Sequence, residues 1–189
     1  MLKENGKCTV IAVCLCLLPS AAPAQEIVHA LAGTVRSVDS ANKTIAVNTE
    51  DGSEGVFSDT TKSKSEIEFD KVLREESTPP SSFSKKGDEV VVYYFGDSFL
   101  QRTAVALQDL GAGPFDKETG TVVKYNRHEH LLTIKESSGT QQSFQIAANT
   151  PVETAVGVVE GAKYDPEKGE QLRVITTNGS TRALFIREN

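Results

Sequence analysis

The sequence predicts an all-β protein made of two small five-stranded barrels in tandem. Two observations lead to this fold class. A unit that opens with Gly-Thr-Val occurs twice, once at Gly33 and once at Gly120. Within each unit apolar residues alternate with polar ones, and a period of two residues is typical of strands. A repeated block of strands therefore predicts two similar β domains in one chain.

Residues 1–24 have the order of a secretory signal. Two lysines give a basic start, an apolar run follows from Cys8 to Leu18, and Ala22-Pro23-Ala24 supplies a small-x-small cleavage pattern. The run is shorter than the about 20 apolar residues that a membrane span needs. A buried N-terminal strand or helix is the alternative. We expect cleavage after Ala24, which leaves Gln25 to Asn189 as a periplasmic or secreted protein.

Composition narrows the classes of function. All three cysteines lie within residues 1–24, so the mature chain has no thiol for a disulfide, a thiolate metal site or a nucleophile. Those residues hold one acidic and two basic side chains, so their removal changes the net charge from −6 to −7. Nucleic-acid binding relies on a basic face. Charge and export therefore argue against a nucleic-acid partner, and no later apolar run is long enough to cross a membrane.

The repeat can be followed residue by residue. Gly33 to Phe57 aligns without a gap with Gly120 to Phe144, at an offset of 87 residues. Five of the 25 aligned positions are identical, and the apolar positions fall in step with the turn glycines. A second block, Gly87 to Leu107, resembles Gly169 to Ile186 with a shorter hairpin. The alternative is two unrelated β-rich halves with similar turns.

Turn dipeptides separate the predicted strands. Asp51-Gly52, Ser138-Gly139 and Asn178-Gly179 each lie between alternating runs. Such dipeptides supply the positive backbone φ that a tight hairpin needs. Each half therefore reads as three strands, an intervening segment and a two-stranded hairpin. Five strands in this grouping favour a small barrel, which leaves few free edges.

The order of glycine, valine and turn residues in each half also resembles a known family. Gly-Thr-Val, then Val-Asp, then Ile-x-Val, Asp-Gly and Phe precede Gly-Asp-x-Val-x-Val in the first half. This pattern is similar to the uncharacterised OB-fold-like domains of bacterial exported proteins, often found in tandem. The resemblance covers nearly all of the mature chain. It implies OB-like barrels at residues 25–110 and 118–189 with a linker at 111–117, and it brings no catalytic residues. OB folds bind oligonucleotides, sugars, metals or proteins, so the fold alone does not choose a ligand.

One connection in the first half is long. Thr60 to Lys86 contains apolar residues from Ile67 to Leu73 that can form one side of a short helix, capped near Ser65. This segment either covers one end of the barrel or forms a lid over a binding face.

Three aromatic residues, Tyr93, Tyr94 and Phe95, follow one another in a predicted strand. Neighbours in a strand face opposite sides. Either the segment from Ile67 to Leu73 buries the outer side, or that side contacts the second barrel or a partner.

Two histidines, His128 and His130, stand one residue apart in the turn that joins the first two strands of the second half. In an extended segment they would point to the same side and chelate a metal. A tight zinc or copper site needs further ligands, such as His29 or a carboxylate. A solvated turn is the simpler interpretation. His128 and His130 remain the candidate metal ligands.

Catalytic motifs are not recognisable. There is no Gly-x-Ser-x-Gly, and Gly111-Ala112-Gly113-Pro114 lacks the lysine and helix start of a phosphate loop. We therefore expect an exported, non-enzymatic binding or interaction module without a cofactor. Its expected partner is an envelope protein or a polysaccharide, recognised across a barrel face or the long first-half loop. The alternative is a weak divalent-metal binder that uses His128 and His130.

Overall fold

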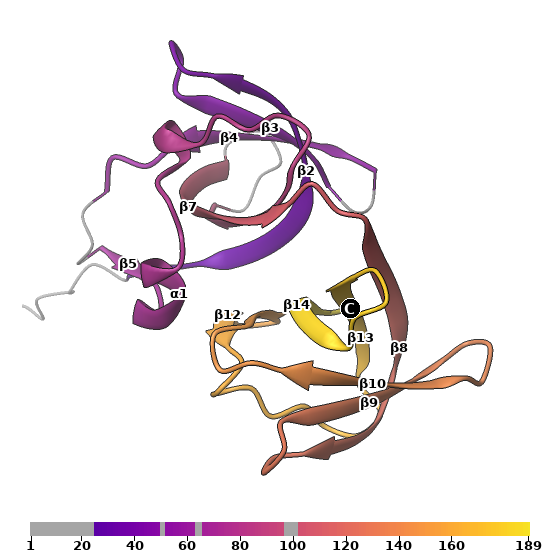
Figure 1. The fold of residues 1–189 in the computed structure, drawn as a ribbon. Helices are drawn as coiled ribbons and strands as arrows, with labels where there is room; N and C mark the ends of the chain where they lie inside the picture. The colour runs from indigo at the N-terminus through magenta and orange to yellow at the C-terminus, as the bar shows by residue number, and fades with distance from the viewer. Residues whose placement is uncertain (1–24, 50–51, 63–65, 97–101) are drawn as a thin grey trace, which may run out of the picture.

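The computed structural model describes residues 25–49, 52–62, 66–96 and 102–189, so the predicted signal at residues 1–24 lies outside it. These residues are mostly β, with 59% in strands and 5% in helices, which confirms an all-β class. The strands form two main sheets, one from each half of the chain, and Figure 1 shows them as two lobes. Within the described ranges, no helix has the length and apolarity to span a bilayer.

Five strands of the first half close on themselves. They are β2 (His29–Asp39), β3 (Thr44–Thr49), β4 (Glu54–Asp59), β6 (Glu89–Phe95) and β7 (Arg102–Gly111). Their order is β2-β3-β4-β7-β6, in a closed barrel. β4 and β7 run parallel, and the other neighbours run antiparallel. Alternate side chains point inward, so Ile45, Val47 and Phe57 are fully buried in the core of this barrel.

The second half contains seven strands rather than the predicted five. They are β8 (Phe115–Asn126), β9 (Leu131–Glu136), β10 (Gln141–Ile146), β11 (Pro151–Thr154), β12 (Gly157–Glu160), β13 (Gln171–Thr177) and β14 (Arg182–Glu188). Their order in the sheet is β10-β9-β8-β13-β14-β11-β12, and β10 also pairs in parallel with β14. Leu132, Ile134 and Phe144 are buried in the core that these strands enclose. The number exceeds five because the segment between β10 and β13 forms the additional hairpin β11–β12, which extends the sheet beyond β14.

The two halves match at the offset of 87 residues. The bounds of β3 and β4 coincide with those of β9 and β10 at this offset. A bulge in β2 against β3 recurs at the same place in β8 against β9. A Cβ atom on Gly33 would stand 2.4 Å from the Asn48 carbonyl oxygen, and one on Gly120 would stand 2.8 Å from that of Lys135. This close approach of two strands requires the glycine that opens each unit.

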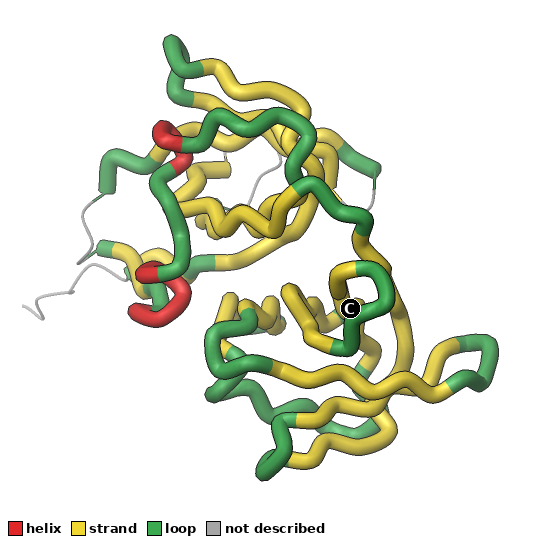
Figure 2. Tube along the Cα trace, in the orientation of Figure 1, coloured by secondary structure: helices red, strands yellow, loops and turns green. Residues whose placement is uncertain are grey.

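The crossover segment between β4 and β6 carries the helical turns, drawn in red in Figure 2. It contains β5 (Ile67–Glu68), which pairs in parallel with β1 (Glu26–Ile27), then α1 (Lys71–Glu75) and the 3-10 turn η1 (Pro80–Ser82). The expected helix therefore exists, but it begins later than the sequence predicted. The Asp70 carboxylate accepts a hydrogen bond from the Val72 amide at 2.8 Å and so caps α1. The predicted cap at Ser65 lies outside the described residues.

A single apolar cluster joins the two halves. Tyr93 and Phe95 on the outer side of β6 pack in this cluster with Phe69 of the crossover segment. Ile175 and Phe185 of the second half belong to the same cluster, and both are fully buried. The outer side of β6 is therefore covered by the crossover segment and by the second half together. For the aromatic run, burial by the segment from Ile67 to Leu73 and contact with the second half thus occur side by side.

Polar contacts reinforce this junction. The buried carboxylate of Glu153 accepts a hydrogen bond from the Ala30 amide at 2.6 Å, and its other oxygen lies 2.7 Å from Nδ1 of His29. Lys117 of the second half donates to the Glu89 carboxylate at 2.6 Å, and Glu89 is only 5% exposed. The second half thus holds both the first residues of β2 and the first residue of β6.

The connection between the halves is shorter than the predicted linker at 111–117. β7 ends at Gly111 and β8 already begins at Phe115. Residues 115–117 belong to a strand because they pair with β13, with Lys117 opposite Ile175. The peptide bond between Gly113 and Pro114 is cis.

Candidate ligand pocket

His128 and His130 lie in the turn between β8 and β9. The Asn126 side chain accepts hydrogen bonds from the backbone amides of His128 at 3.1 Å and Glu129 at 3.4 Å. The aligned turn in the first half is built in the same way around Asp39. His130 has a φ of 49°, which is the left-handed region. The segment is therefore a capped turn rather than an extended strand, so the rule that alternate residues share a side does not apply to this pair.

The structure brings no further ligand to this pair. His128 is exposed, and Nδ1 of His130 lies 3.4 Å from the Tyr125 hydroxyl. His29, considered as a third ligand, contacts Glu153 instead. In the described ranges there is no group of three or more His, Cys, Asp or Glu side chains that could hold a metal ion.

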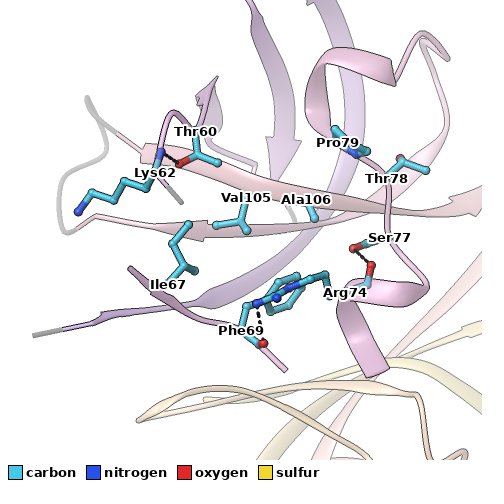
Figure 3. Close-up of a pocket in the computed structure, with 10 residues that line it drawn as sticks. All are labelled: Thr60, Lys62, Ile67, Phe69, Arg74, Ser77, Thr78, Pro79, Val105 and Ala106. Carbon is cyan, nitrogen blue, oxygen red and sulfur yellow. Dashed lines mark hydrogen bonds between the residues drawn. The ribbon is translucent and has the colours of Figure 1, made fainter. Parts of the chain in front are cut away.

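A cavity of about 300 Å³ lies between the crossover segment and β7 (Figure 3). The crossover segment pairs with β7 at two places. The Thr60 amide donates to the Ala104 carbonyl at 3.1 Å, and Thr78 and Leu107 exchange two backbone hydrogen bonds of 2.8 Å. Between these attachments Val105 and Ala106 line the cavity from the strand side.

Most of the lining is apolar. Ile67 and Phe69 face the cavity from the crossover segment, and Val105 and Ala106 face it from β7. These residues also belong to the cluster that joins the halves. Val105 and Ala106 can both face this outer side because β7 has an irregularity here, where Ala104 and Ala106 pair with Tyr94 and Tyr93 and Val105 is left between them. The cavity therefore has an apolar floor that is fixed by packing.

Arg74 is one of two cations in the described lining of the pocket, the other being Lys62. Its guanidinium donates to the Phe69 carbonyl at 2.9 Å and lies 5.5 Å from the centre of the Phe69 ring. Figure 3 shows the side chain lying across that ring. The neighbouring acids have other partners, since Glu75 pairs with Lys71 and Glu76 accepts from Asn149. Among the described residues, no carboxylate forms an ion pair with Arg74.

The side chains of Lys62, Ser77 and Thr78, which also line the pocket, form hydrogen bonds within the protein. Lys62 donates to Glu26 at 2.5 Å, and its ammonium group lies 5.1 Å from the centre of the Phe95 ring. The Ser77 hydroxyl donates to the Arg74 carbonyl at 3.0 Å, and the Thr78 hydroxyl donates to the Leu107 carbonyl at 3.3 Å. Arg74 is therefore the group that is placed to meet an anion.

This arrangement suits binding. The described residues that line the pocket include no histidine, cysteine, aspartate or glutamate, which are the usual general bases and strong nucleophiles. Sequence reasoning located the crossover segment as a place for recognition but did not single out Arg74 or Val105. The signal was the length of the connection together with one arginine directly after its apolar run.

No protein-family model matches the chain, and no curated protein shows significant similarity to it.

Proposed function

We propose that the protein is an exported, non-enzymatic binding module made of two OB-like barrels. The barrel assignment is supported by the strand order, because each half pairs the third strand of its main sheet in parallel with its last strand, β4 with β7 and β10 with β14. Export is supported by the signal pattern in residues 1–24. Expression of the full chain in a bacterium should yield a periplasmic protein that begins at Gln25. A cytoplasmic product that keeps residues 1–24 would contradict export.

The pocket beneath the crossover segment carries the proposal of a binding function. Its volume of about 300 Å³ is at the lower end of the range typical of ligand sites, about 300–1,000 Å³. It combines an apolar floor with one oriented cation, which is the usual composition of a specific ligand site. The crossover segment is also one of the two places where the sequence predicts recognition, the other being a barrel face.

A protein of the cell envelope is the favoured partner. Sugar rings bind by stacking on an open aromatic face, and the aromatic residue of this pocket is Phe69. Arg74 covers that ring at 5.5 Å, and Tyr93 lies with its ring centre 4.8 Å from it. With Phe69 covered, the pocket suits an apolar side chain of a protein better than a polysaccharide.

A pair of valine substitutions tests this function. Val105→Phe fills the floor of the pocket, whereas Val56→Phe adds the same volume at a position on β4 that is 49% exposed. The wild-type chain and both variants are applied to an immobilised peptide library and to a glycan array. We expect the wild type and Val56→Phe to bind the same peptides and Val105→Phe to lose them. Binding that depends on Val105 but occurs only on glycans would assign the pocket to a polysaccharide. If no ligand distinguishes Val105→Phe from the wild type, the pocket is not the binding site.

A further inference from the structure

We infer that the pocket captures the C-terminal residue of a partner protein, with an apolar side chain under the crossover segment and the terminal carboxylate on Arg74. This inference rests on the proposed binding function and names the chemistry that the pocket recognises. Capture of a terminal carboxylate is a known mode of peptide recognition.

The anion is indicated by the state of Arg74. The residue is half-buried, and its guanidinium is held against Phe69 by one hydrogen bond and by the ring. A cation that is partly removed from water and lacks a carboxylate partner is stabilised when an anion arrives. The guanidinium plane offers a fork of N–H donors that matches a carboxylate, and little conformational freedom is lost because the side chain is already placed.

The cavity is large enough for the apolar part of the ligand. The volume of about 300 Å³ lies between two fixed attachments of the crossover segment, at Thr60 and Thr78. Such a space accommodates a side chain of the size of leucine or phenylalanine, with room for the terminal group that carries it. In a C-terminal residue the apolar side chain and the carboxylate share one Cα atom, so both can be bound by a site of this length.

The net charge of the chain favours a basic partner segment over an acidic one. The crossover segment between β4 and β6 carries six basic and six acidic side chains, so its own charges balance, but the whole chain is acidic, with a net charge of −6. A partner with many carboxylates would be repelled, whereas basic residues before an apolar terminus would be attracted. The ligand expected from the surface is therefore a basic segment that ends in one apolar residue.

The test uses the peptide Lys-Lys-Ser-Gly-Leu with an N-terminal fluorophore, as the free acid and as the C-terminal amide. Binding to the Gln25–Asn189 chain is followed by fluorescence anisotropy. We expect the amide to bind about tenfold more weakly than the acid, because one charge-assisted contact is lost. Arg74→Gln should abolish the difference in affinity between the acid and the amide, because the charge-assisted contact is removed, and Arg74→Lys should restore part of that difference. Lys62→Gln, which removes a cation already paired with Glu26, should have a smaller effect.

Three results would overturn the inference. Equal binding of acid and amide to the wild type would exclude a role for the carboxylate, and this comparison needs no variant that might misfold. If Val105→Phe still abolished binding in that case, the proposed binding function would be supported, and only recognition of the terminal carboxylate would be rejected. If the small acid 3-phenylpropionate bound as tightly as the peptide acid, the source would be a free carboxylic acid rather than a protein terminus. No binding of the peptide acid would also refute capture of a C-terminal residue. The binding function itself would then be tested separately, by the peptide library.

Discussion

The carboxylate of Glu153 is buried between the two halves, and its protonation is therefore coupled to folding. Burial raises the pKa of Glu153 above its ordinary value of 4.5, although hydrogen bonds from His29 and Ala30 act to lower it. The folded chain holds this proton more tightly than the unfolded chain does. The resulting stabilisation is fully present below the ordinary pKa and is lost as pH rises through the raised pKa. We expect the wild type to lose stability relative to Glu153→Gln as the pH rises above the ordinary pKa of 4.5, measured by urea denaturation.

Glu75→Gln is the matched control for this experiment. The Glu75 side chain is 66% exposed and pairs only with Lys71 on the same helix. Its stability should follow the wild-type curve across the same pH range. A difference between wild type and Glu153→Gln that stays constant with pH would show that Glu153 does not titrate with folding.

The histidine turn allows a second prediction at the residue scale. His128 is exposed and His130 lies beside Tyr125 in a left-handed backbone conformation. Two imidazoles without further ligands make a poor site for a divalent ion. We expect calorimetric titrations with zinc, nickel and copper(II) to give the same weak heats for the wild type and for His128→Ala/His130→Ala. Micromolar binding that disappears in the variant would instead establish a metal site at this turn.

Single residues differ in how far the sequence can predict their roles. The glycines at 33 and 120 open both repeats, and their place against the next strand follows from the shared pattern. Glu153 contacts His29 across 124 residues, and no local pattern connects the two. Arg74 becomes part of a pocket only because the crossover segment folds back over β7. Roles that depend on distant partners were therefore not visible in the sequence.

At the scale of elements, α1 depends on its cap. Asp70 accepts from the amide of Val72 and also receives Lys163 of the second half at 2.5 Å. Asp70→Ala removes both contacts and should lower the free energy of unfolding by about 1 kcal/mol or more. Asp70→Asn keeps a good capping side chain and removes only the charge. Because the Lys163 side chain is 62% exposed, the ion pair contributes little, and Asp70→Asn should lower the free energy of unfolding by less than Asp70→Ala does. Thermal denaturation of both variants measures the difference. Equal losses would mean that the ion pair, rather than the cap, stabilises this segment.

Elements with a clear period were predicted well. β3, β4, β9 and β10 alternate in hydrophobicity and are separated by glycine turns, which fix both the strands and their ends. The start of α1 was predicted too early, because Ile67 and Phe69 fit a helical side as well as they fit a strand that is covered on one face. The two-residue strands β1 and β5 are too short to show a period at all, and they exist because their chain segments meet in space.

At the scale of the whole molecule, Phe185 should contribute to the stability of both halves. It is fully buried in the cluster that also contains Tyr93 and Phe69 of the first half. Phe185→Ala should cost about 3–5 kcal/mol and should speed amide hydrogen exchange in β6 as well as in β13 and β14. Phe144→Ala removes a ring of similar burial from the core of the second half alone and should leave exchange in β6 unchanged. Unchanged exchange in β6 for Phe185→Ala would show that the halves are energetically independent.

One strand position contributes to the shared cluster from both halves. The offset between the second blocks of the repeat is 82 residues, from Gly87 to Gly169, and it carries Tyr93 onto Ile175. Both residues lie in the cluster. The chain that joins the two halves is short, since β7 ends at Gly111 and β8 begins at Phe115. This tether keeps the two surfaces of the cluster at high effective concentration, so their contact does not weaken when the protein is diluted.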